Sequence, residues 1–113
     1  MILYNVTVSI DPAVAVEWVE WMRTKHIPDV MATGCFFPDV MATGCFLESR
    51  FSRVNGEEEN GFTYATTYLA ESQEKLDTYQ AVFAPALKQE HSERYLGKFA
   101  AFRTFLTVIE EFK

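Results

Sequence analysis

The stretch ILYNVTVSIDP, residues 2–12, decides how this chain begins to fold. Apolar and mostly polar residues alternate along its first nine positions, and that period of two is typical of a strand with one buried face. Asp11 can cap a helix, and Pro12 suits the first helical position. The buried face of the predicted strand carries Ile2, Tyr4, Val6, Val8 and Ile10.

The rest of the chain continues this alternation of strands and helices. The spacing of apolar residues predicts a first helix from Pro12 to about Lys25, and a second that starts after Ser72, breaks near Ala84 and resumes to about Tyr95. Period-two segments predict three further strands at 46–54, 62–70 and 99–110. The order strand, helix, strand, strand, helix, strand indicates an α+β, ferredoxin-like fold, with two helices on one face of a four-stranded antiparallel sheet.

The other face of that sheet is then left open, and its side chains are mixed in character. Such a face on a small domain commonly meets a partner. We therefore expect a homodimer that forms through the open sheet face. The residues expected there are Leu3, Asn5, Thr7, Thr67, Leu69, Arg103 and Phe105.

A perfect internal repeat interrupts the connection between the first helix and the second strand. Residues 28–36 and residues 38–46 both read PDVMATGCF. Two such short units cannot build a solenoid, so a local tandem duplication, either engineered or recent, explains them better. We expect the second copy to lead into the strand through Cys45 and Phe46, and the first copy to form a helical extension or a bulge. The domain is thus expected to span 1–113, with a duplicated segment at 27–46.

Composition excludes several classes of protein. The chain has 113 residues and a net charge of −6, which disfavours nucleic acid as a partner. No apolar run reaches the length of a membrane span, and the N-terminus lacks the pattern of a signal peptide, so we expect a cytoplasmic protein with no membrane partner. Because Cys35 and Cys45 are copies of one position, a disulfide framework or a zinc site is poorly supported.

Two long segments carry a resemblance to a known family. WVEWMRTKHIPDVMATGCF at 18–36 and QEHSERYLGKFAAFRTFL at 89–106 resemble a bacterial family of small proteins, domain of unknown function 4286. The resemblance covers essentially the whole chain and implies a ferredoxin-like fold; the repeat is its one departure. The layout is also similar to that of dimeric α/β-barrel proteins, which include small monooxygenases without metal or flavin. No catalytic residue is carried over from either group.

The two histidines are the candidates for catalysis. His26, after Lys25, is interpreted either as a general base or as a cation at the C-terminus of the first helix. His91 shares a helical face with Leu87 and Tyr95, so it either lines a pocket or is satisfied by a neighbouring carboxylate. The two histidines can meet in space, but without a fixed carboxylate they are a weak metal signal.

Arg103 and Trp21 are candidates for a ligand site or an interface, together with the open-face residues Asn5, Thr7 and Thr67. Arg103 interrupts an apolar strand, so it either binds an anion, crosses a dimer interface or extends its head into water from an edge strand. Trp21, with other aromatic residues, either lines a pocket or packs in the core.

Two functions remain open from the sequence. The first is a homodimeric structural or small-ligand-binding domain. The second is a small cofactor-independent oxygenase or isomerase that acts on an apolar ligand, with His26 or His91 as the base. The chain has no phosphate loop, dinucleotide fingerprint or zinc pattern, so no metal and no cofactor are expected in either case. Whether the protein is an enzyme is left undecided at this point.

Overall fold

Four antiparallel strands form the sheet of the protein. The computed structural model describes residues 1–34, 44–56 and 62–113. The strands are β1 (Ile2–Ile10), β2 (Glu48–Arg53), β3 (Phe62–Ala70) and β4 (Phe99–Thr107), in the spatial order β2-β3-β1-β4. The first and third strands therefore lie in the centre of the sheet, and β2 and β4 lie at its edges.

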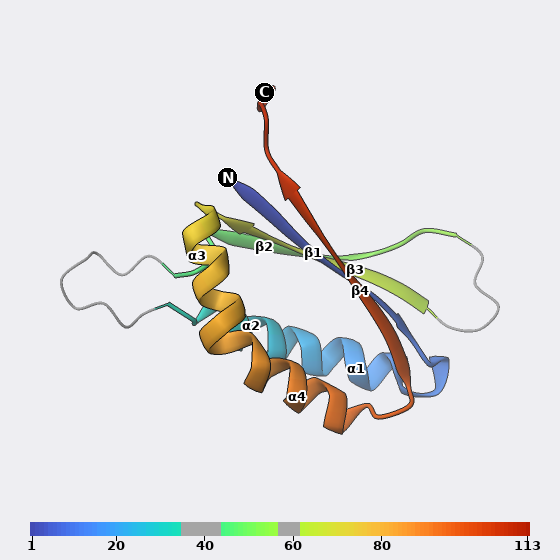
Figure 1. Ribbon diagram of the computed structural model, residues 1–113. Helices are drawn as coiled ribbons and strands as arrows, with labels where there is room; N and C mark the ends of the chain where they lie inside the picture. The colour runs from blue at the N-terminus through green and yellow to red at the C-terminus, as the bar shows by residue number, and fades with distance from the viewer. Residues whose placement is uncertain (35–43, 57–61) are drawn as a thin grey trace.

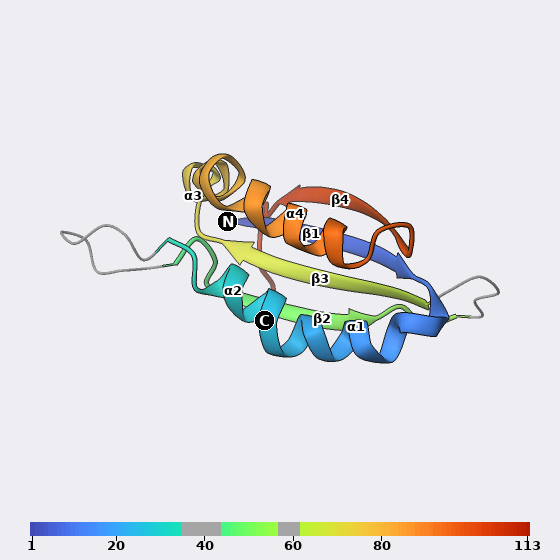
Figure 2. The same cartoon turned by 90° about the horizontal axis from the view of Figure 1, so that it is seen from below.

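Two helical stretches cover one face of this sheet (Figures 1 and 2). The first begins with a 3₁₀ turn at Pro12–Val14 and continues through α1 (Ala15–Trp21), a π-helical turn (Met22–His26) and α2 (Ile27–Met31). The second comprises α3 (Gln73–Thr78), a π-helical turn (Tyr79–Phe83) and α4 (Ala84–Arg94). Within the described residues, none of these helices has the length and apolar character needed to cross a bilayer.

Both predicted helix caps are confirmed. The Oδ1 atom of Asp11 accepts a hydrogen bond of 2.8 Å from the backbone N–H of Ala13. The Oγ atom of Ser72 accepts one of 3.2 Å from the backbone N–H of Lys75. Each side chain satisfies a backbone donor that the first helical turn leaves without an intrahelical partner.

The first helix extends further than its sequence pattern predicts. It does not end near Lys25 but continues to Met31, with Pro28 inside it. A proline inside an α-helix loses a hydrogen bond and clashes with the preceding turn. Here a π-helical turn, Met22–His26, directly precedes α2, which contains Pro28. In the second helical stretch, the π-helical turn Tyr79–Phe83 directly precedes α4, which contains Pro85. These wider turns let both helices pass a proline without ending.

The core lies between the helices and the sheet. Trp18, Ile10, Leu76 and Val30 are its largest fully buried side chains. Tyr4, Phe46, Tyr68 and Tyr79 pack against one another at one end of the layer: the ring of Tyr4 stacks on Phe46 and Tyr68, and Tyr79 meets Phe46 edge-on. Trp18, Phe51 and Tyr64 form a second aromatic group toward the other end.

The two copies of the repeated segment contribute different parts to this core. From the first copy, residues 28–31 form the end of α2, and Val30 is buried with only 1 % of its surface exposed. From the second copy, Cys45 and Phe46 are buried beside the start of β2. The helical extension and the entry into the strand are thus as predicted; the remaining repeat residues, 35–43, including Cys35, lie outside the described residues.

The chain closes on itself between these two contributions. The backbone N–H of Cys45 donates a hydrogen bond of 3.2 Å to the carbonyl of Thr33. Gly34 has a φ of 87°, and a Cβ atom there would lie 2.6 Å from the backbone nitrogen of Cys45. Glycine is therefore required at this position, both for its backbone conformation and for the close approach of the returning chain.

The sheet register corrects the predicted position of Arg103 and Phe105. Arg103 pairs with Val6 and Phe105 pairs with Tyr4, so both side chains lie on the helix-covered face. The prediction placed them on the open face because β4 carries apolar residues on both sides. The open face instead presents Phe102 and Leu106 from β4.

Candidate functional site

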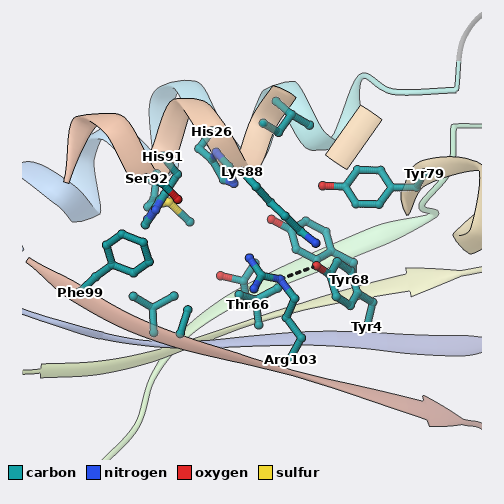
Figure 3. Close-up of a pocket in the computed structure, with 15 residues that line it drawn as sticks. Tyr4, His26, Thr66, Tyr68, Tyr79, Lys88, His91, Ser92, Phe99 and Arg103 are labelled. Atoms are coloured by element: carbon teal, nitrogen blue, oxygen red, sulfur yellow. Dashed lines mark hydrogen bonds between the residues drawn. The ribbon is translucent and has the colours of Figure 1, made fainter. Parts of the chain in front are cut away.

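A cavity of about 50 Å³ lies between the sheet and the helical layer (Figure 3). Strands β1, β3 and β4 form its floor, and the two helical stretches form its roof. Its walls are partly aromatic and partly polar. The polar and aromatic side chains that line it are Tyr4, His26, Thr66, Tyr68, Tyr79, Lys88, His91, Ser92, Phe99 and Arg103.

The two histidines come together at this cavity from different helices. His26 belongs to the first π-helical turn and His91 belongs to α4, and their ring centroids are 5.7 Å apart. Trp21 packs against both rings, with centroid distances of 5.3 Å to His26 and 5.8 Å to His91. His26 is not a cation at a helix C-terminus, as one interpretation of the sequence had it, because the helix continues beyond it.

His91 is held by an indole. The Nε1–H of Trp18 donates a hydrogen bond of 2.9 Å to Nε2 of His91. Because an indole nitrogen can only donate, Nε2 of His91 carries no proton, and the neutral ring carries its proton on Nδ1. The partner of this histidine is therefore an aromatic N–H group and not the carboxylate that one interpretation of the sequence expected.

Both histidines are neutral at physiological pH. Burial is the main cause that lowers the pKa of His26 from 6.5 to about 4; Lys25 and Arg103 lower it further, against an opposing effect of Asp29. Burial likewise lowers the pKa of His91 to about 4, with further contributions from His26 and Arg103. The Nδ1 atom of His26 is buried and has no hydrogen-bond partner among the described residues.

Two cations and three tyrosines surround the other end of the cavity. The Nε–H of Arg103 donates a hydrogen bond of 3.0 Å to the hydroxyl oxygen of Tyr4 (Figure 3). Lys88 extends from α4 toward the sheet, and its Nζ lies 3.4 Å from Oε1 of Gln80. Burial raises the pKa of Tyr68 and of Tyr79 well above the usual range, so their phenols keep their protons and remain hydrogen-bond donors.

The structure divides the predicted site residues into three groups. His26, His91 and Arg103 line the cavity, and Trp21 covers the histidine pair without lining it. The remaining candidates, Asn5, Thr7 and Thr67, lie on the open face of the sheet. Asn5 donates one hydrogen bond to Thr7 and accepts another from Thr67, and each bond is 3.0 Å long.

Sequence reasoning missed several residues of the cavity. Lys88 and Ser92 were not singled out, although they flank His91 at helical spacing. Tyr79, within the second predicted helix, was not named as a candidate either. Lys88, His91 and Ser92 are spaced i, i+3 and i+4, which places them on one face of a helix. This spacing was the signal that could have identified Lys88 and Ser92.

The described residues hold no group of three histidine, cysteine, aspartate or glutamate side chains arranged to bind a metal ion. The two cavity histidines therefore stand without a third ligand of these types in the part of the chain that the structure describes.

Comparison with known proteins places the chain in a family. The profile described as "Domain of unknown function (DUF4286)" matches residues 1–109. The chain belongs to the DUF4286 family. No curated protein matches this DUF4286 chain in sequence.

Solved structures support the fold of this family member. An ethyl tert-butyl ether D (EthD) family protein from Bacillus halodurans C-125 aligns with a TM-score of 0.60 at 12 % identity, over 92 % of this chain and 97 % of that one. A dimeric ferredoxin-like protein from an uncultured marine organism aligns with a TM-score of 0.55 at 12 % identity, over 98 % of both chains. At this identity the likeness shows the fold alone, which is α+β and ferredoxin-like.

Proposed function

We propose that this protein is a homodimeric small-ligand-binding domain, and that the ligand occupies the cavity between the helices and the sheet. The observation that carries the proposal is the buried, unpartnered Nδ1 atom of His26 beside the neutral ring of His91. A buried polar atom without a partner destabilises a fold by about 1–3 kcal/mol. A ligand that donates a hydrogen bond to, or accepts one from, His26 offsets this loss.

The proposed dimer rests on the open face of the sheet. Phe102 and Leu106 expose 63 % and 48 % of their surface there. Leu3, in the central strand β1, lies on the same face, paired with β3 on one side and with Leu106 of β4 on the other. The polar residues Asn5, Thr7 and Thr67 satisfy one another by hydrogen bonds, so a partner sheet covers this strip without leaving them unpaired. A neighbour in fold, from an uncultured marine organism, is described as dimeric.

A thermal-shift screen against compounds of a few heavy atoms tests the binding function, because the cavity has a volume of only about 50 Å³. A ligand that binds only the native state raises the melting temperature in proportion to its occupancy. We expect hits with the parent protein, and we expect them to be lost in His26→Phe, which fills the cavity and removes the imidazole. Val16→Thr, a change at an exposed position of α1, is the control and retains the hits. A hit list that is the same for the parent and His26→Phe contradicts the proposal.

An isomerase or oxygenase is the second candidate, with His26 as the general base. The unpartnered ring nitrogen of His26, a residue of the cavity wall, favours it. Its pKa of about 4 argues against it, because a general base works best with a pKa near the working pH. Binding is therefore the better-supported function. Exchange of acidic ligand protons for deuterium, present in the parent and absent in His26→Gln, would establish the enzyme instead.

A further inference from the structure

The cavity concentrates positive charge in an acidic protein. The chain has 16 acidic and 10 basic residues. Of the 15 residues that line the cavity, however, Lys88 and Arg103 are cationic and none is acidic. An acidic protein that keeps carboxylates away from one internal site has a local potential opposite to that of its overall charge.

Neither cation of the cavity has an ionic partner among the described residues. The nearby acidic residues on the helices pair elsewhere: Asp29 with Lys25, and Glu17 with Arg94. Arg103 is bound only through its Nε to Tyr4, and Lys88 meets only the amide oxygen of Gln80. The positive charge at this end of the cavity is therefore not neutralised by the described part of the chain.

The field of Arg103 acts on the groups that share the cavity. After burial, which is the main cause, Arg103 is among the charges that lower the pKa of His26, His91 and Lys88. The guanidinium opposes protonation of these groups because each protonation adds positive charge beside it. The same positive field attracts a negative charge that enters the cavity.

The hydrogen bond that Arg103 donates to Tyr4 uses only the Nε–H of the guanidinium. Tyr4 is buried with 2 % of its surface exposed, and its hydroxyl accepts from Nε only. The two terminal nitrogens of the guanidinium are then free to bind both oxygens of one carboxylate, which is the geometry that arginine favours. Tyr4 acts here as a positioning residue, because it orients Arg103 without itself supplying the charge.

We propose that the ligand of this cavity is a small carboxylate, held by Arg103 and Lys88, with its carbon body directed toward the aromatic walls and the histidine pair. This inference rests on the proposed binding function and specifies its ligand class. It differs from the apolar ligand that the sequence alone suggests. Phe99, Tyr68 and Tyr79 provide the apolar contacts that distinguish an organic carboxylate from a simple inorganic anion.

Isosteric pairs of probes test the charge directly. Acetate and acetamide have the same shape, as do propionate and propionamide, and only the first of each pair is an anion at neutral pH. Each is titrated into the isotope-labelled full chain, and the ring resonances of His26 and His91 are followed by NMR. We expect the carboxylates to shift these resonances and to bind at least about tenfold more tightly than the amides, a difference of about 1.4 kcal/mol.

Charge-removing variants locate the site. Arg103→Met and Lys88→Met each keep much of the side-chain volume, and each is expected to weaken acetate binding by about tenfold or more. Arg23→Met is the matched control. It removes the same charge from an exposed ion pair with Glu20, and acetate binding should not change. The amide spectrum of each variant verifies that it is folded.

The outcomes separate this inference from the function on which it rests. If acetamide shifts the histidine resonances as strongly as acetate, the cavity binds ligands but the proposed selectivity for anions is wrong. If acetate binds equally well to the parent and to both cavity variants, the proposed site is wrong. If none of the four probes perturbs either histidine, both the carboxylate inference and the binding function are contradicted.

Discussion

Trp18 and His91 lie 73 positions apart in the chain and are joined by one buried hydrogen bond of 2.9 Å, which links the two helical stretches above the cavity. Trp18 is fully buried, and 8 % of His91 is exposed. Because the acceptor is Nε2 of the imidazole, this link exists only while that nitrogen is unprotonated. The bond therefore couples helix packing to the charge state of the cavity.

Replacement of His91 by phenylalanine should destabilise the protein by about 1–3 kcal/mol, because the indole N–H of Trp18 is then left buried and unpaired. Urea unfolding, followed by Trp fluorescence, measures this change. His91→Gln is the matched variant, since its side-chain oxygen can still accept the hydrogen bond. It should recover part of the loss; equal destabilisation by both substitutions would show that the hydrogen bond contributes little.

Stability should fall as the pH is lowered from about 6.5 toward 4. Both histidines have a folded-state pKa of about 4, below the ordinary 6.5, so the unfolded chain binds more protons across this window. Their contribution is complete above pH 6.5 and is lost as the pH approaches 4. At about 1.4 kcal/mol per pKa unit, each histidine contributes about 3 kcal/mol.

Urea unfolding at pH 7 and at pH 5 measures this dependence before most carboxylates begin to titrate. His26→Phe and His91→Gln should each remove about half of the slope. A free energy of unfolding that stays constant between pH 7 and pH 5 contradicts the assignment of two neutral buried histidines.

The proposed dimer should dissociate when charge is placed on the open face. Light scattering at micromolar concentration should give the parent a mass about twice that of the 13.0 kDa chain. Phe102→Glu should give the mass of one chain, because a carboxylate is then buried without a partner at the interface. Val16→Glu is the control, since Val16 is an exposed apolar residue of α1, and its mass should equal that of the parent. A parent of 13 kDa rules out the dimer.

A chain with one copy of the repeat should fold to the same structure. Deletion of 28–37 and deletion of 35–44 produce the same 103-residue sequence, because the copies are identical. Gly34 already lies against Cys45, so rejoining the chain there needs little rearrangement. Circular dichroism and thermal melting should give a folded protein at least as stable as the parent, since a shorter connection loses less entropy on closure.

Deletion of 27–36 provides the matched comparison. It also leaves one copy, but places Phe37 in the position of Ile27, which packs partly buried against both halves of the core. Overpacking of this kind costs about 1–3 kcal/mol. The chain that retains Ile27 should therefore be the more stable of the two. An unfolded product in both cases would show that the fold needs both copies of the repeat.

Much of the fold was predictable because its local signals agree with one another. The bounds of β1 and β3 follow from strict alternation, and the caps at Asp11 and Ser72 follow from side-chain chemistry. The end of the first helix was not predictable in this way. Pro28 reads as a helix start, and only the preceding π-helical turn lets the helix pass through it.

The candidate site was predictable in its parts but not as an arrangement. His26 and His91 were identified, but nothing local indicates that an indole holds His91. The alternation along β4 was correct, yet its apolar residues on both sides did not reveal which side faces the helices. The pairing of Arg103 with Val6, a contact across 97 positions, decides this, and no local pattern encodes it.

The closure between Thr33 and Cys45 has a consequence for the evolution of chain length in this protein. The hydrogen bond between Thr33 and Cys45 holds the two ends of the intervening segment together. The number of residues in that segment therefore does not affect the pairing of β2 with β3. Copying errors at this junction therefore escape the selection that removes insertions from strands and helices. We therefore expect length variation among relatives to gather here, at the position where this sequence carries its internal repeat.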